Sequence, residues 1–384
     1  MSQPDFHQLV EQITQQYDQL LKENVELKSE LASLKAQLSA QRAEANITPK
    51  RSDKSNTENK YQLTRKSSKP FWQTKLKTTV EWQSLQIDFS DSITAAHVSS
   101  DGLYSFGTVD SNIYLYCPDT SIVTATVDGL KGAINSIKSD STTGIYASCS
   151  GDGNIHIWSP KSTSQFFQGF RRQSMGQDVI QCNTILQKHT AAATDITWLG
   201  DTGLLVSGSW DKQVCVWDVV HSSCIKSDDL RHQINTLDSY QTFYIAGMQN
   251  GEIAFLDKNS QDADAITFNH GKSIVTRVKF IDDSSFISGG SDSKIKEWDI
   301  RQPHQPLVEV DIDQVPTKFD VRGFDVLIPS EVGRMRILDL NSKDITLIEK
   351  SPFSYSISEV VYLDDNLFLA ASWDGQAATG KIAL

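Results

Sequence analysis

A short pattern of residue types recurs along this chain at fixed intervals. In its fullest form a histidine stands 22 residues before an aspartate, a serine four before it and a tryptophan six after it. Two copies keep all three intervals, and a third lacks only the histidine. The copies are His189, Ser207, Asp211 and Trp217; His270, Ser288, Asp292 and Trp298; and Ser148, Asp152 and Trp158. Identical intervals in two copies are hard to produce by chance, so we expect a fold built from repeated units.

The pattern resembles that of the WD-repeat β-propeller family. Each unit of about 40 residues is then a four-stranded antiparallel blade that must stack on its neighbours to bury its faces. The resemblance implies that the aspartate lies in the turn between the second and third strands, bonded to turn amides and to the histidine. The histidine would contact the serine hydroxyl, to which the indole N–H would also donate. These residues would build the fold. A Ser-His-Asp catalytic triad is the alternative, but an active site is normally single and this set recurs.

Seven units can be counted from the position six residues after each turn residue. The successive intervals are 42, 59, 39, 42, 40 and 42 residues. Units 4 and 6 have lost the aspartate, and only units 3 and 5 keep the histidine in its place. We therefore predict an all-β fold, a seven-bladed propeller over residues 79–384. The counted positions are Tyr116, Trp158, Trp217, Leu256, Trp298, Leu338 and Gly380.

The seventh unit is one strand short. It begins at Ile357 and supplies three strands, so its outermost strand must come from elsewhere. The segment at about Val80–Gln86 precedes the first unit and has no other blade to join. We expect it to complete blade 7, which clasps the two ends of the propeller and removes an exposed edge. Truncation at either end should then harm the whole domain.

Residues 4–42 predict one long helix that forms a coiled coil. Apolar residues repeat with a heptad period, and three consecutive d positions are leucine. The single Asn24 at an a position weakens the seam but fixes its register, which favours a parallel two-stranded homodimer. Glu23 and Lys28 have the offset of an interchain g-to-e ion pair. Two alternatives are a heterodimer with another coiled-coil chain and an amphipathic helix lying on the propeller. The seam residues are Val10, Ile13, Tyr17, Leu20, Asn24, Leu27, Leu31, Leu34 and Leu38.

Residues 43–78 are polar and predict a disordered basic linker. Residues 42–78 hold ten basic and three acidic side chains, a charge of +7, and residues 1–41 carry −3, so the total of −12 leaves −16 for residues 79–384. The basic side chains are dispersed, as in a solvated tether; a nuclear-import signal or contact with an acidic partner is the alternative. Ser67 follows Arg65 and Lys66, an order that suits a basophilic kinase.

The interval of 59 marks an insertion of about 17 residues between blades 2 and 3, within residues 161–188. Aromatic and arginine side chains anchor many interfaces, and a loop beyond the needs of the scaffold often carries function. The insertion is therefore a candidate partner-binding segment, and Ser174 within it is a candidate phosphorylation site. The alternative is an extended outer strand whose phenylalanines pack on the blade. The candidate binding residues are Phe166, Phe167, Phe170, Arg171 and Arg172.

Two tryptophans stand directly before turn aspartates. Trp210 and Trp373 each occur in the order Ser-Trp-Asp, so both should lie near the same rim of the ring. Exposed aromatic side chains there could hold a partner peptide. The alternative is that the family merely tolerates bulky residues at this place.

The remaining composition excludes several classes. The five cysteines are odd in number, and neither they nor the histidines show metal-ligand spacing, so we expect reduced thiols, no metal and no cofactor. The N-terminus lacks a basic start followed by an apolar run, and no stretch approaches 18 apolar residues. We expect neither secretion nor a membrane span, and a location in the cytoplasm or the nucleus, the latter slightly favoured by the basic linker.

Three functional classes follow from this plan. The first, which we favour, is a non-enzymatic scaffold that dimerises through its coiled coil and binds segments of other proteins on the propeller rim. The second is a subunit similar to the β-subunit of heterotrimeric G proteins, whose N-terminal helix pairs with a small partner chain; the long linker and the Asn24 seam argue against it. The third is an enzyme or a nucleic-acid binder. No convergent acid/base set is visible, and a propeller of charge −16 repels phosphate backbones.

Overall fold

The computed structural model describes residues 76–85, 87, 89, 91–160, 178–260, 265–329, 333–348 and 350–382. The predicted helix and its seam (4–42), the linker up to residue 75 with Ser67, and the insertion residues from Phe166 to Ser174 lie outside these residues. The coiled coil, the linker and the binding role of the insertion therefore stay predictions.

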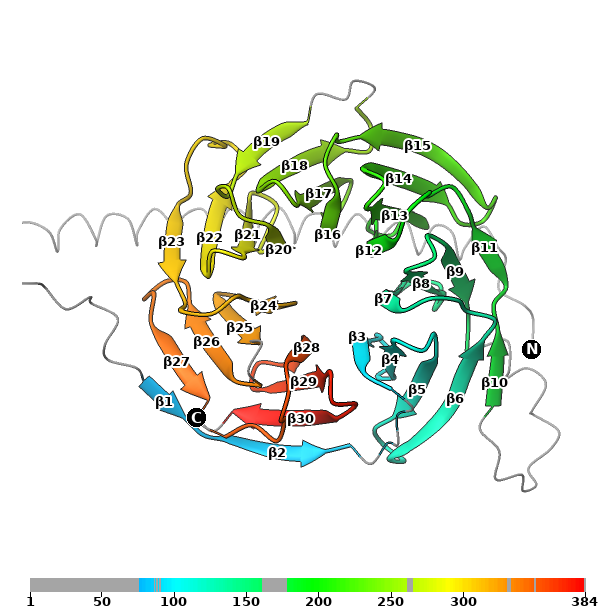
Figure 1. Ribbon diagram of the computed structural model, residues 1–384, viewed down its shortest axis with the longest axis horizontal. Coiled ribbons are helices and arrows are strands. Elements are labelled where there is room, and N and C mark those ends of the chain that lie inside the picture. Colours follow the sequence, from blue (N-terminus) through cyan, green and yellow to red (C-terminus); the bar gives the residue numbers. More distant parts are fainter. Residues whose placement is uncertain are drawn as a thin grey trace, which may run out of the picture. The chain divides into compact units, whose positions relative to one another are not determined.

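The described residues form seven sheets around a common centre, as predicted from the seven repeats (Figure 1). The first strand of each blade lies nearest the centre, and the fourth lies at the perimeter. The strands of blades 1 to 3 are β3 (Ile93–Val98), β4 (Tyr104–Thr108), β5 (Ile113–Cys117) and β6 (Ile122–Asp128); β7 (Ile134–Ser139), β8 (Tyr146–Ser150), β9 (Ile155–Trp158) and β11 (Thr184–Leu186); and β12 (Ala193–Trp198), β13 (Leu204–Ser209), β14 (Gln213–Asp218) and β15 (Ser223–Asp229).

Blades 4 to 7 repeat this order. Their strands are β16 (Ile234–Tyr240), β17 (Phe243–Met248), β18 (Glu252–Asp257) and β19 (Ile266–Asn269); β20 (Val275–Phe280), β21 (Ser285–Gly290), β22 (Lys294–Asp299) and β23 (Val308–Asp311); β24 (Asp320–Arg322), β25 (Asp325–Pro329), β26 (Met335–Asp339) and β27 (Ile345–Ile348); and β28 (Ile357–Asp364), β29 (Leu367–Ser372), β30 (Ala377–Ile382) and β2 (Val80–Ser84).

Burial follows the position of a strand in its blade. All five residues of β4 and of β8 are buried, because a second strand is covered on both faces by the neighbouring blades. The outermost β15 is exposed at three of its seven positions. Close approach between blades also demands glycine in the second strand: a Cβ at Gly208 would lie 2.6 Å from the Ile234 side chain of the next blade. The core is therefore a set of interfaces between blades.

Strand β2 closes the ring. It pairs with β30 in antiparallel register from Val80 with Ile382 to Ser84 with Ala378, as expected from the missing strand of blade 7. Trp82 packs edge-on against Phe353 and Phe368, with ring centroids 5.6 and 5.4 Å away. Strand β2 and the last described strand, β30, are thus neighbours in one sheet, which leaves β30 without a free outer edge.

Two blades gain a fifth strand. β1 (Leu76–Thr78) adds in parallel to β27 of blade 6, although the sequence placed these residues at the end of the linker. β10 (Asp178–Gln181), which follows the third strand of blade 2, adds in parallel to β6 of blade 1 before the chain returns to blade 2 as β11. The insertion predicted between blades 2 and 3 therefore lies within blade 2, between its third and fourth strands. Both fifth strands are placed by main-chain hydrogen bonds to a strand edge that would otherwise be free. Main-chain bonds do not depend on a pattern of side chains, so the local sequence does not predict them.

Candidate partner-binding site

The strands of a blade alternate in direction, so the turns between second and third strands share one side of the ring with the starts of all first strands. We call this side the turn face. In blade 3 a chain of side-chain hydrogen bonds fixes the turn. Asp211 accepts from His189 Nδ1 and from the amide of Gln213, both at 2.9 Å. His189 Nε2 lies 2.7 Å from Ser207 Oγ, to which Trp217 Nε1 donates at 2.8 Å.

Burial sets the protonation state of this histidine. Removal from water lowers the pKa of His189, and the nearby Asp211 only partly offsets the effect. In a neutral ring one nitrogen donates and the other accepts. Nδ1 can therefore donate to Asp211 while Nε2 accepts the Ser207 hydroxyl proton, and every member of the chain is satisfied.

Blade 5 contains the same four side chains and blade 2 only three of them. His270 lies 2.7 Å from Ser288 Oγ and 3.2 Å from Asp292, and Trp298 Nε1 donates to Ser288 at 2.8 Å. In blade 2, Leu130 stands at the histidine position and Trp158 Nε1 donates to Ser148 at 3.2 Å. Ser207 and Ser288 thus each contact a histidine and a tryptophan, whereas Ser148 contacts only a tryptophan.

The substitution Ser207→Ala should destabilise the propeller by about 1–3 kcal/mol, because it leaves buried groups of both His189 and Trp217 without a partner. Ser148→Ala is the matched control and should cost less, since only the Trp158 indole loses its acceptor. Urea denaturation of the two variants measures the difference. Equal losses would contradict a joint role of histidine and tryptophan at Ser207.

Stability should fall as the pH drops below about 6.5. The pKa values of His189 and His270 are lowered in the fold, mainly by burial. The unfolded chain therefore binds protons that the folded chain does not, so stability is complete above the ordinary histidine pKa and declines below it. Each histidine adds at most about 1.4 kcal/mol per pH unit. Melting curves at about pH 7.5 and 5.5 test this, and a double His189→Gln, His270→Gln variant should show a smaller pH response; an unchanged response would refute the assignment.

The fixed turns present the two candidate tryptophans. Trp210 directly precedes Asp211, and its side chain is 46% exposed. Trp373 directly precedes Asp374 and is 47% exposed. Asp374 accepts from the amides of Ser354 and Gln376 at 3.0 and 3.1 Å, so this turn is also held in place. Both aromatic rings are therefore displayed on the turn face by rigid backbone.

A ring of small polar residues lies at the starts of the first strands. Five of its members donate to a backbone carbonyl of the following blade at 2.5–3.3 Å. Thr276 departs from this rule, since its buried Oγ1 has no hydrogen-bond partner among the described residues. The equivalent acceptor for Thr276 would be the carbonyl of Pro316 in blade 6. Ser358 donates instead to Ala371 of its own blade, so the ring is open between blades 5 and 6 and between blades 7 and 1. The ring residues are Thr94, Asn135, Thr194, Asn235, Thr276, Thr317 and Ser358.

Charged side chains cross the ring centre below these residues. Arg277 of blade 5 lies 3.1 Å from Asp195 of blade 3 and 3.5 Å from Glu359 of blade 7, and all three are buried. Burial alone would raise the pKa of Glu359, but the charges of Lys318, Lys138 and Arg277 hold it below its usual range. The carboxylate therefore stays ionised and the network is a set of paired charges.

Lys318 occupies the centre of the turn face. Its ammonium donates to the carbonyls of Thr94 and Asn135 at 2.9 and 2.6 Å, and it lies 3.4 Å from Glu359. Three acceptors match the three N–H groups, so this cation is engaged within the protein and is not free to bind an anion. Lys318 instead links blade 6 to blades 1, 2 and 7.

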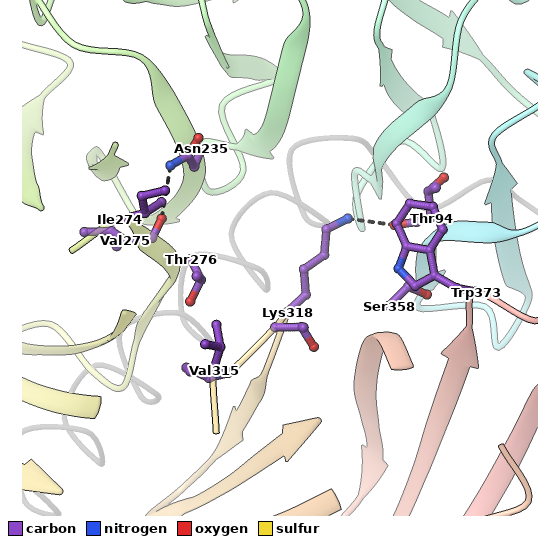
Figure 2. A pocket seen from close by; sticks show the side chains of 11 residues that line it. Thr94, Asn235, Ile274, Val275, Thr276, Val315, Lys318, Ser358 and Trp373 are labelled. Atoms are coloured by element: carbon purple, nitrogen blue, oxygen red, sulfur yellow. Dashed lines mark hydrogen bonds between the residues drawn. The ribbon is translucent and has the colours of Figure 1, made fainter. Parts of the chain in front are cut away.

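Two adjoining cavities of about 320 and 430 Å³ lie around Lys318. We call them together the mouth. Trp373 and Lys318 line both cavities, Trp210 lines the larger one, and Ile274 lines the smaller one. Figure 2 shows Lys318 extending toward Thr94, with Trp373 on that side and the blade 5 residues opposite. Aromatic and aliphatic walls around an ammonium that is already paired suit a side chain of another molecule.

The structure brings some of the predicted residues together. Trp210 and Trp373, taken from blades 3 and 7, line one cavity. The insertion residues and both candidate phosphorylation sites lie outside the described residues.

Sequence reasoning missed Ile274 and Lys318 at the mouth. The recurrence of threonine or asparagine at intervals of about 41 residues was the available signal, because it marks the start of each first strand.

The described residues hold no group of three or more histidine, cysteine, aspartate or glutamate side chains that could bind a metal ion. The same residues contain no helix long and apolar enough to cross a membrane.

Comparison with known proteins returns the same repeats. The family model described as "WD domain, G-beta repeat" matches residues 121–159, 180–218 and 265–299, which end with the third strands of blades 2, 3 and 5. "WD repeat-containing protein 37" of Mus musculus is 22% identical over 275 residues, covering 63% of this chain and 55% of that protein.

Two further relatives carry different names. "Pre-mRNA-processing factor 19 homolog 2" of Arabidopsis thaliana is 22% identical over 229 residues, covering 58% of this chain and 41% of that protein. "Ribosome biogenesis protein WDR12 homolog" of Drosophila virilis is 27% identical over 201 residues, covering 46% of this chain and 45% of that protein. The chain spans about half the length of the curated relatives it matches.

Proposed function

Because the chain belongs to the WD-repeat family, we propose that it is a non-enzymatic scaffold whose mouth binds segments of partner proteins. The observation that carries the proposal is the pair of half-exposed tryptophans, Trp210 and Trp373, that line one cavity on rigid turns. Aromatic side chains around a pocket are the usual anchors of protein interfaces. The charge of −16 over residues 79–384 favours partner segments that are basic.

The proposal includes the rest of the chain. Residues 4–42 form a parallel homodimeric coiled coil, and residues 43–78 form a basic tether to a propeller that spans residues 79–384. A flexible tether of about 36 residues has an r.m.s. span of roughly 30–36 Å. Two linked propellers would gain avidity for partners with repeated motifs.

The mouth is tested by comparing partners that co-purify with tagged variants. Trp210→Ala combined with Trp373→Ala should remove propeller partners without unfolding the protein, because both rings are half exposed. Phe324→Ala is the matched control: this phenylalanine is 56% exposed in the turn between β24 and β25, on the opposite face. Loss of the same partners from both variants, or from neither, would count against the mouth.

The dimer is tested with a chain that lacks residues 1–42. The scaffold proposal expects mass measurement of the full chain to give a homodimer and of the shortened chain a monomer, with partners kept at lower yield. A small coiled-coil chain that co-purifies one to one and disappears with the helix would instead support the G-protein-like alternative.

A further inference from the structure

Three reactive groups meet at the outer edge of blade 3. They are the thiols of Cys215 and Cys224 and the ammonium of Lys188. The two cysteines lie on neighbouring antiparallel strands, β14 and β15, beside an irregularity in their pairing between Val216 and Trp217. Lys188 lies between β11 and β12, directly before His189. The cluster is therefore built from three separate segments of the chain.

The outer thiol is in contact with the ammonium. Lys188 Nζ donates to Cys224 Sγ at 3.2 Å, and Cys224 Sγ lies 3.1 Å from the carbonyl oxygen of Lys226. Although its slight burial lowers the pKa of Lys188, its hydrogen bond to Cys224 and neighbouring groups raise it overall, so the amine stays charged. Lys188 is exposed and Cys224 is partly buried, which lets a small oxidant reach the sulfur.

The second thiol stands behind the first. Cys215 is fully buried and packs in the core between blades 2 and 3, with Cys224 against the same cluster. Cys215 Sγ lies 3.5 Å from Ser227 Oγ on the same strand as Cys224, and burial raises the pKa of Cys215 to about 12. Cys215 is thus shielded from solvent, and Cys224 is the sulfur that an oxidant meets first.

We propose that Cys224 and Cys215 form a peroxide-responsive dithiol with Lys188 as a positioning residue. The Cys224 sulfur attacks one oxygen of hydrogen peroxide, the O–O bond breaks, and the departing hydroxide takes the thiol proton and leaves as water. Cys224 becomes a sulfenic acid. The Cys215 thiol then attacks this sulfur, a second water leaves, and a disulfide joins β14 to β15. Two thiols are oxidised and one peroxide is reduced to two waters.

Lys188 favours the first step through its charge. An ammonium 3.2 Å from the sulfur attracts the negative charge that develops on the departing peroxide oxygen as the O–O bond breaks. The three residues of this cluster lie in and beside blade 3, and none of them lines the mouth. Because Cys224 pairs with Trp217, the disulfide would form beside the hydrogen-bonded chain that supports the Trp210 turn.

The experiment treats the reduced full chain with hydrogen peroxide and follows its cysteine peptides by mass spectrometry. The wild-type protein should form a Cys215–Cys224 disulfide that a thiol reductant reverses. Cys215→Ala should instead accumulate a sulfenic acid at Cys224 that a 1,3-dicarbonyl probe traps. Lys188→Met should slow the oxidation of Cys224 about tenfold, and Lys188→Arg should restore part of the rate.

Cys117 on β5 serves as the internal reference, since it is also partly exposed but lies beside Thr120. An unchanged rate of Cys224 oxidation in Lys188→Met, or an equal slowing of Cys117 oxidation in that variant, would overturn the role of the ammonium. Irreversible oxidation of Cys224 in the wild type without a disulfide would overturn the role of Cys215. Circular dichroism of each reduced variant establishes that the comparison is made on folded protein.

Discussion

Replacing Arg277 by methionine should destabilise the propeller by about 3–5 kcal/mol, the loss typical of removing one partner from a buried ion pair. Its guanidinium lies between Asp195 and Glu359, and all three side chains are at most 4% exposed. Without the arginine two buried carboxylates face each other across the ring centre. Methionine keeps most of the side-chain length, so the loss of charge dominates over the loss of packing. Urea denaturation measures the effect.

An exposed arginine provides the control for this substitution. Arg301 forms an ion pair with Asp299 at 2.7 Å, but its side chain is 76% exposed. Arg301→Met should therefore change stability much less, because water solvates the carboxylate that is left. Combining Arg277→Met with Asp195→Asn and Glu359→Gln should recover part of the loss, since the two buried carboxylates that lose the arginine are then neutral. Similar losses for Arg277→Met and Arg301→Met would show that the central network does not stabilise the ring.

A chain that begins at residue 85 should fail to give a cooperatively folded propeller. It lacks β1 and β2, so β30 loses its partner strand and blade 7 exposes the outer edge of its third strand. It also lacks Trp82, whose contacts with Phe353 and Phe368 join the closing strand to the core of blade 7. Removing such an aromatic side chain alone commonly costs about 3–5 kcal/mol, and the lower end applies to the partly buried Trp82.

A chain that begins at residue 76 is the matched control. It keeps β1 and β2 and should melt at the temperature of the full chain. The point variant Trp82→Ala should melt between the two, with the cooperative transition intact. Thermal denaturation followed by circular dichroism distinguishes the three. A cooperative transition at an unchanged temperature in the chain from residue 85 would refute closure by β2.

Much of the fold was predictable because repeats impose equal spacing. The 22-, four- and six-residue intervals predict which side chains of a blade meet, and in blade 3 these side chains are joined by hydrogen bonds of 2.7–2.9 Å. A blade is a local unit, so its internal contacts are separated by few residues. The missing strand of blade 7 was predictable for a related reason. Every blade of a closed ring needs a fourth strand to pair with its third strand.

The site was predictable only in part. The position of Trp210 and Trp373 before turn aspartates places them on one face, and both line the same cavity. Their shared cavity also depends on Ile274 and on Lys318, whose ammonium bonds to Thr94 and Asn135. Lys318 and Asn135 are 183 residues apart in the chain. No local pattern pairs residues so distant.

The sequence by itself determined the repeat, the number of blades, the turn aspartates and the closing strand, because these follow from the spacing of residues within one unit and from the need to close a ring. Only the tertiary structure decided which blade receives β1 and β10, which charges meet at the centre and where the mouth opens. Arg277 is 82 residues from each of Asp195 and Glu359, and closure of all seven blades is what brings the three charges together. Such contacts are set by the geometry of the whole ring.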